Sequence, residues 1–159
     1  MAKSYRVTPI VRAVNKVTGA FVRRGRGPEF TYVLTVVGRR SGVARSTLVD
    51  VMADGGQRWL VAPYGETNWV WNARAAGVAT LSRGGRDEQV RLVELSPEER
   101  VPILRMYLRQ VRIVRSYFDV TAGSPDDQLL AVAPAHPVFR IEPLASDELA
   151  VEKPEGSRA

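Results

Sequence analysis

Three arginines and several hydroxyl side chains follow the apolar run FTYVLTVV within one short segment. It reads VGRRSGVARSTLVDV over residues 37–51 and places Arg39, Arg40 and Arg45 among glycines, serines and a threonine. Arginine guanidinium groups and the free backbone N–H groups of a glycine-containing turn can each donate several hydrogen bonds to one phosphate or carboxylate. The segment therefore predicts an anion site; the alternative is an exposed basic turn that serves only solubility.

A second segment, APYGETNWVWN over residues 62–72, combines aromatic rings, amides and a glycine. Aromatic faces stack on flat heterocycles, and a glycine permits close approach of the backbone. The amides can bond the carbonyls and N–H groups of a ring. Tryptophan more often fills a core, so the alternative is that Trp69 and Trp71 are core residues. Both interpretations can hold if one tryptophan lies in the core and the other contacts a ligand.

Short runs of β-branched and aromatic residues, separated by turn residues, predict that most of the chain forms strands. Because these runs do not alternate with crossover helices, a doubly wound parallel sheet is disfavoured. We expect a mainly β fold with helices (α+β), a small closed or partly open antiparallel barrel. The expected strands are residues 30–38, 46–53, 57–64, 78–82, 88–95 and 136–143, with hairpin turns at DGG (54–56) and RGGRD (83–87).

Two helices are expected in the first half of the chain. Residues 9–24 have apolar residues at steps of three and four and cations elsewhere, which is typical of an amphipathic helix. We interpret this helix as a packing element or a lid, with membrane-surface contact as the alternative. Residues 65–77 predict a short helix between an N-cap at Thr67 and a C-cap at Gly77.

Two further helices are expected in the second half. Residues 96–118 open with a capping box at Ser96–Glu99, and we expect the long helix to bend or restart at Pro102. Residues 123–134 predict a short helix capped by Ser124. The 159 residues form one barrel domain, 29–143, preceded by the basic segment 1–28 and followed by a polar tail, 144–159, which we expect to be disordered.

Composition narrows the classes of function. The chain has no cysteine and one histidine, which excludes thiolate chemistry and argues against a metal site.

The start of the chain does not read as a secretory signal, and its longest uncharged stretch is too short to span a bilayer. We therefore expect a cytoplasmic protein. Residues 1–49 hold ten Lys or Arg against one acid, so the basic third points to an anionic partner. A nucleic-acid-binding barrel is a rival interpretation, although aromatic residues are not interleaved among the arginines.

Three stretches, LTVVGRRSGVARST, GQRWLVAPYGETNWVWNARAAGVATL and HPVFRI, resemble the deazaflavin-dependent nitroreductase family. These are small split β-barrel oxidoreductases of actinobacteria and related organisms that use coenzyme F420. The resemblance covers roughly residues 10–143, and its specific part is G-R-x-S-G-x-x-R followed by W-x-x-N. It implies a split antiparallel barrel of the FMN-binding type, with FMN itself as the alternative cofactor.

The resemblance also implies which residues contact the coenzyme. The phosphodiester and glutamate tail of F420 would lie against the arginines, and its tricyclic ring against PYGETNW. Two departures from the family pattern are Ser46-Thr47-Leu48 in place of Thr-Thr-Pro, and Asp50 where a small apolar residue is common. The implied contacts are Arg39, Arg40, Ser41, Gly42, Arg45, Ser46 and Thr47, then Ala62, Tyr64 and Gly65, then Asn68, Trp69 and Asn72.

The implied activity is hydride transfer from reduced F420 to an electron-poor quinone, nitroaromatic or activated enone, in which the cofactor supplies the chemistry. A proton donor to the product is sought among Tyr64, Tyr107 and Tyr117, and the catalytic residue stays open. The protein is expected as a monomer or homodimer.

The single histidine, His136, precedes a proline, and we interpret it as a turn or core residue. A hydrolase built from Ser41, His136 and Asp50 is discounted because the chain has no G-x-S-x-G elbow.

Overall fold

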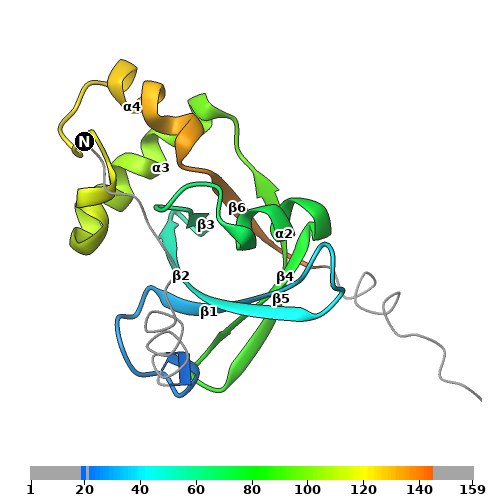
Figure 1. Ribbon diagram of the computed structural model, residues 1–159. Helices are drawn as coiled ribbons and strands as arrows, with labels where there is room; N and C mark the ends of the chain where they lie inside the picture. Colours follow the sequence, from blue (N-terminus) through cyan, green and yellow to red (C-terminus); the bar gives the residue numbers. More distant parts are fainter. Residues whose placement is uncertain (1–18, 21, 145–159) are drawn as a thin grey trace, which may run out of the picture.

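The computed structural model describes residues 19, 20 and 22–144, and it shows a barrel of six antiparallel strands. The closed order is β1-β2-β3-β6-β5-β4 (Figure 1). The α+β antiparallel barrel predicted from the sequence is thereby confirmed. The strands are β1 (Thr31–Val37), β2 (Ala44–Asp54), β3 (Gln57–Val61), β4 (Val78–Arg83), β5 (Arg86–Glu94) and β6 (Val138–Pro143).

Both predicted hairpins are present, and glycine pairs make both turns. Gly55 and Gly56 join β2 to β3 with φ of +56° and +79°. Two consecutive positive φ angles match the twist of the flanking strands and favour glycine. The same holds for Gly84 and Gly85 between β4 and β5. Strand β3 ends at Val61, so the three residues after it leave the sheet and start the connection to α2.

Helix α2 (Asn68–Ala76) lies between Thr67 and Gly77 as predicted. Two of its apolar residues, Val70 and Ala73, pack into the interior of the barrel. Gly77 has φ +71° and donates its backbone N–H to Ala73, which ends the helix. Helix α2 therefore closes one end of the barrel.

Helix α3 (Pro97–Gln110) starts at the predicted capping box. Ser96 Oγ accepts from the backbone N–H of Glu99 at 3.4 Å, and Glu99 Oε2 accepts from that of Ser96 at 2.8 Å. The helix continues through Pro102, where we expected a bend or restart. It is also shorter than predicted, because residues 112–117 form the 3₁₀ helix η1 (Arg112–Tyr117).

A second short segment packs against α3 (Figure 1) and consists of α4 (Asp126–Val132) and the 3₁₀ helix η2 (Ala133–Ala135). The predicted cap at Ser124 is wrong. Its hydroxyl accepts from the backbone N–H of Thr121 at 3.0 Å, and Pro125 occupies the N-cap position.

Two apolar clusters lie on opposite sides of the barrel wall. Val49 and Val51 of β2 belong to the interior cluster, whereas Met52 belongs to the cluster that includes α3. Since side chains alternate along a strand, Asp50 shares the outer face with Met52. The outer face of β2 thus looks towards α3.

The predicted helix 9–24 and the tail 144–159 lie mostly outside the described residues. Residues 19, 20, 22 and 23 are helical, and the side chain of Val22 is buried. Within the described ranges, no helix combines the length and the apolar character needed to cross a membrane.

Candidate functional site

The arginine-containing turn between β1 and β2 is closed by its own backbone. Gly38 donates to the carbonyl of Val43 at 2.8 Å, and Gly42 donates to that of Gly38 at 2.9 Å. A Cβ on Gly38 would lie 2.7 Å from Ser41 Oγ, a distance that forces a rearrangement. Gly42 has φ +67°. The two glycines of the G-R-x-S-G motif therefore permit this compact turn.

Asn72 of α2 fixes this turn to the end of the barrel. Its Oδ1 atom accepts from the backbone N–H of Arg39 at 3.1 Å and from its guanidinium at 2.8 Å. Asn72 is buried, with 6% of its surface exposed. The structure thus brings the two predicted segments together, and it does so through two residues of the predicted set that bind each other.

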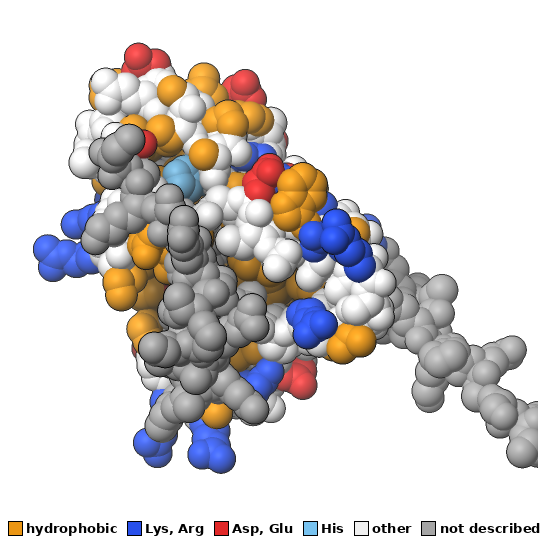
Figure 2. Space-filling view, in the orientation of Figure 1, with side chains coloured by type: hydrophobic (Ala, Val, Ile, Leu, Met, Phe, Trp, Pro, Cys, Tyr) orange, Lys and Arg blue, Asp and Glu red, His pale blue; other side chains and the backbone are white. Residues whose placement is uncertain are grey.

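Exposed cations and hydroxyls occupy the rest of the turn. Arg40 and Arg45 are exposed, and neither guanidinium group makes a hydrogen bond or ion pair with another described residue. Ser46 Oγ lies 2.8 Å from Thr35 Oγ1 and accepts from Arg23 at 3.4 Å. Figure 2 shows basic side chains over this end of the barrel. Two guanidinium groups are thus available to an anion.

The segment between β3 and α2 rests on the residues that precede β6. Ala62 donates to the carbonyl of Pro137 at 2.9 Å. Gly65 has φ +84°, and a Cβ there would lie 3.4 Å from the carbonyl oxygen of Ala135. Tyr64 is 38% exposed and meets Tyr117 edge to face at 4.7 Å between ring centroids. An aromatic surface therefore lies beside a tightly packed backbone.

The two tryptophans of this segment have different surroundings. Trp69 packs against the interior cluster, with its ring 5.8 Å from that of Phe139. Trp71 is 43% exposed, and the guanidinium of Arg74 lies 4.7 Å from its ring centroid. Asn68, at the start of α2, is exposed. Trp69 thus packs on the core while staying partly exposed, and Trp71 lies at the surface.

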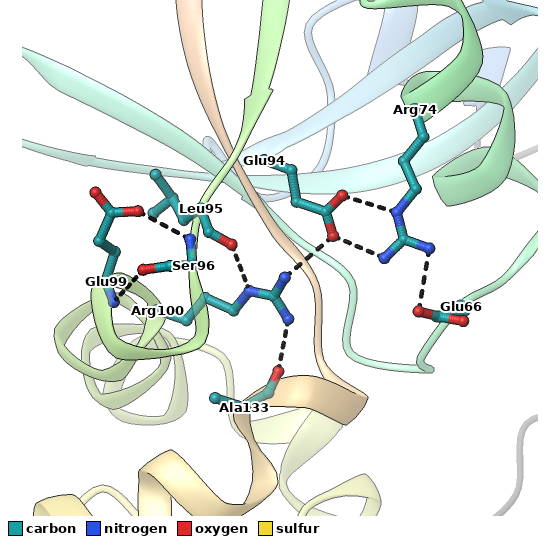
Figure 3. A network of polar contacts seen from close by, with 8 residues as sticks. All are labelled: Glu66, Arg74, Glu94, Leu95, Ser96, Glu99, Arg100 and Ala133. Carbon is teal, nitrogen blue, oxygen red and sulfur yellow. Dashed lines mark hydrogen bonds and ion pairs between the residues drawn. The ribbon is translucent and has the colours of Figure 1, made fainter.

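An ion-pair network holds segment 62–72 and helix α2 against the neighbouring elements (Figure 3). Arg74 binds both carboxylate oxygens of Glu94, at 2.8 and 2.7 Å, and binds Glu66 at 3.0 Å. The buried Arg100 binds Glu94 at 3.1 Å and the carbonyl of Ala133 at 2.8 Å. Hydrogen bonds from Arg74 hold the pKa of Glu94 below its ordinary value. The network joins α2, β5, α3 and η2.

Asp50 makes contacts that the sequence did not predict. Its carboxylate accepts from the hydroxyl of Tyr107 at 3.0 Å and from that of Thr31 at 3.2 Å. Burial, the largest effect, raises the pKa of Asp50 above its ordinary value. Tyr107 is fully buried, and burial followed by the charge of Asp50 raises its pKa strongly.

His136 lies in the core. Its ring stacks on Phe118, with centroids 3.9 Å apart and planes 18° from parallel. It is 7% exposed, and burial lowers its pKa, so the ring is neutral at pH 7. Ser41, which a hydrolase would need, accepts instead from the backbone of Val43 at 3.2 Å.

Comparison with known protein families identifies the family of this chain. The model of the family F420H(2)-dependent quinone reductase matches residues 6–132. The chain belongs to this family. It is therefore an oxidoreductase, and its coenzyme is F420. No curated protein matches the chain.

Two solved structures with a TM-score of 0.54 share the fold of this chain at low sequence identity, and a third has a lower score. One, described as a domain-swapped dimer, is 17% identical, with a TM-score of 0.54 over 84% of this chain and 96% of that one. Protein Atu2129 of Agrobacterium tumefaciens, of unknown function, is 15% identical, with a TM-score of 0.54 over 87% of this chain and 58% of that one. An F420-H2 dependent reductase (FDR-A) is 19% identical over 71% of this chain and 94% of that one, with a TM-score of 0.49.

The donors at the site fit the chemistry of F420. Its phosphodiester and glutamate carboxylates are anions, and Arg40 and Arg45 are exposed cations beside one turn. The hydroxyl of Thr67, in the segment leading into α2, is buried without a hydrogen-bond partner among the described residues. A buried hydroxyl without a partner is unfavourable, which marks this segment as one that a ligand can complete.

Proposed function

We propose that this chain reduces an electron-poor acceptor, a quinone, nitroaromatic or activated enone, at the expense of reduced F420. The supporting observation is the turn held by the Arg39–Asn72 contact, which presents two exposed guanidinium groups next to the aromatic segment 62–72. Bound there, F420 would supply a hydride.

Two groups of residues would hold the coenzyme in this proposal. Guanidinium and hydroxyl donors of the turn would bind its anionic part, and the segment after β3 would face its ring. Asn72 would act indirectly, because its Oδ1 atom is used by Arg39. The direct set is Arg40, Ser41, Gly42, Arg45, Ser46 and Thr47, with Ala62, Tyr64, Gly65, Asn68 and Trp69.

The residues of the chain itself orient the ligand and exclude water. Gly65 and its close neighbour Ala135 hold the backbone on one side, and the exposed ring of Tyr64, braced by Tyr117, offers an apolar face. Ring faces of this kind stack on flat heterocycles and remove them from water.

We also propose where the chain acts and in which oligomeric state. It would act in the cytoplasm as a monomer or a homodimer; a solved structure of the same fold is described as a domain-swapped dimer. Contact with a membrane surface through residues 9–24 would bring the site to lipophilic acceptors. Flotation with vesicles of anionic and of neutral lipid checks this contact.

Titration of the purified protein with F420, followed by the fluorescence of the coenzyme, tests the proposed site. We expect selective binding, which Arg40→Ala with Arg45→Ala weakens at least tenfold through loss of two cations. Arg112→Ala is the matched control, because this exposed arginine lies in η1, outside the proposed contacts. Binding of FMN or of a short oligonucleotide instead of F420 would contradict the proposal.

A further inference from the structure

We propose that Asp50 donates the proton that a quinone oxygen takes up when the acceptor is reduced. This inference rests on the proposed function, because it assigns a role at the same site. It starts from the placement of one carboxyl group on the outer face of β2.

Asp50 lies in line with the anion site. Ser46, Leu48 and Asp50 alternate with inward-facing residues, so they form a row on the outer face of β2. The rise of a strand places Ser46 and Asp50 about 13 Å apart along this row. Both ends of the row are bound to β1, Ser46 to Thr35 and Asp50 to Thr31. A ligand anchored at the arginine turn and extended along this face reaches Asp50.

The surroundings of Asp50 make its carboxyl group a weaker acid than an exposed aspartic acid, because burial raises its pKa. Its partners are two hydroxyls, Tyr107 from α3 and Thr31 from β1, and no cation of the described chain binds it. Asp50 is only partly buried, so the residue keeps some exposure to solvent. Removal from water without a compensating cation disfavours the charged form.

Tyr107 is a weaker acid than Asp50 in this setting. The hydroxyl of Tyr107 is fully buried and donates to Asp50, and both conditions raise the pKa of that hydroxyl. Tyr64 adds to this effect from the segment after β3. Tyr107 is therefore a positioning residue that orients the carboxyl group and tunes its acidity, and Asp50 is the stronger acid.

The step balances with one proton from the protein. Reduction of a quinone to a hydroquinone takes up one hydride and one proton, and oxidation of the coenzyme would release one proton to solvent. The reduced coenzyme supplies the hydride. The O–H bond of Asp50 breaks, the proton forms the new O–H bond of the acceptor, and solvent returns a proton to the carboxylate.

The first measurement is made on the coenzyme-free protein. Carbon-13 NMR of the Asp50 carboxyl follows its titration in the wild type and in Tyr107→Phe. We expect the pKa of Asp50 to lie above its ordinary value of 3.8, and to rise further in Tyr107→Phe, because that hydrogen bond stabilises the charged form. An Asp50 that titrates at or below 3.8 overturns the inference.

The second measurement compares two acceptors. Menadione needs a proton on reduction, whereas the phenazine methosulfate cation takes up a hydride and becomes neutral without one. We expect Asp50→Asn to lower the ratio of the menadione rate to the phenazinium rate about 100-fold. In the wild type the menadione rate falls as pH rises through the pKa of Asp50, and Tyr107→Phe moves this fall to higher pH.

The control separates this inference from the function it rests on. F420 titration of wild type and Asp50→Asn should give similar affinities. If the wild type fails to bind F420, the proposed function falls and the inference with it. If binding is retained and Asp50→Asn leaves the acceptor ratio and the pH profile unchanged, only the inference is overturned.

Discussion

The side-chain oxygen of Asn72 accepts two hydrogen bonds from Arg39, one from its backbone N–H and one from its guanidinium. The first bond fixes the backbone of the β1–β2 turn, and the second fixes one side chain. Because Asn72 lies on the helix that closes the barrel, the turn takes its position from the core. The conformation of the proposed anion site therefore depends on a residue that need not touch the ligand.

Asn72→Leu should loosen the turn more than Arg39→Ala does. The Leu variant loses both hydrogen bonds, and we expect a loss of about 1–2 kcal/mol in the free energy of unfolding. F420 affinity should fall about tenfold, since the coenzyme must then order the turn. In Arg39→Ala the backbone bond remains, and a smaller effect on both quantities is expected. Urea denaturation and F420 titration measure them.

A different result for this pair would be informative. If Arg39→Ala weakens F420 binding as much as Asn72→Leu does, while its stability stays near that of the wild type, the Arg39 guanidinium contacts the coenzyme directly. The loss of F420 affinity in Arg39→Ala would then come from a missing contact with the coenzyme and not from a changed conformation of the turn.

Local patterns predicted the barrel because the signals for its hairpins are local. Glycine pairs at 55–56 and 84–85 specify tight turns, and alternating residues around them specify strands. The capping box at Ser96 and the terminal glycine Gly77 are local signals too, and they predicted the start of α3 and the end of α2 correctly. The cap predicted at Ser124 is the exception, because the Ser124 hydroxyl binds the backbone of Thr121 instead of the start of α4.

Elements whose ends depend on distant contacts were not predicted correctly. The end of α3 and the start of η1 are set by packing of Val111, Val114 and Phe118 into the outer cluster. The Asp50–Tyr107 contact joins residues 57 positions apart, and Arg39–Asn72 joins residues 33 apart. A motif indicated that Arg39 and Asn72 belong to one site, but only the closed barrel shows that they bind each other.

Gly65→Ala should perturb the segment after β3. A side chain at φ +84° is strained, and its Cβ would press on the carbonyl of Ala135. We expect a loss of about 1–3 kcal/mol in stability together with weaker F420 binding. Gly56→Ala is the matched control, since Gly56 has φ +79° and open space around its Cβ position. Calorimetry should show that both variants are destabilised, and only Gly65→Ala should lose affinity. Equal affinities would separate this segment from the coenzyme site.

Glu94→Gln should weaken the network behind the site in a pH-dependent way. Glu94 accepts two hydrogen bonds from Arg74 and one from Arg100, and the hydrogen bonds of Arg74 are the main cause of its lowered pKa. A carboxylate with a lowered pKa in the folded state stabilises the protein above its unfolded pKa, near 4.5, and this stabilisation is lost as pH falls through the folded pKa.

We therefore expect Glu94→Gln to lower the free energy of unfolding by about 2–3 kcal/mol at pH 7, since it leaves the buried Arg100 without its ion-pair partner. The difference from the wild type should shrink below pH 4.5, where the wild-type carboxylate also takes up a proton. Glu66→Gln is the control, because this carboxylate is 44% exposed and its ion pair with Arg74 contributes about 1 kcal/mol or less. Urea denaturation of the three proteins between pH 3 and pH 7 makes the comparison. A difference for Glu94→Gln that stays constant over this range would mean that its partners are held by packing and not by the charge.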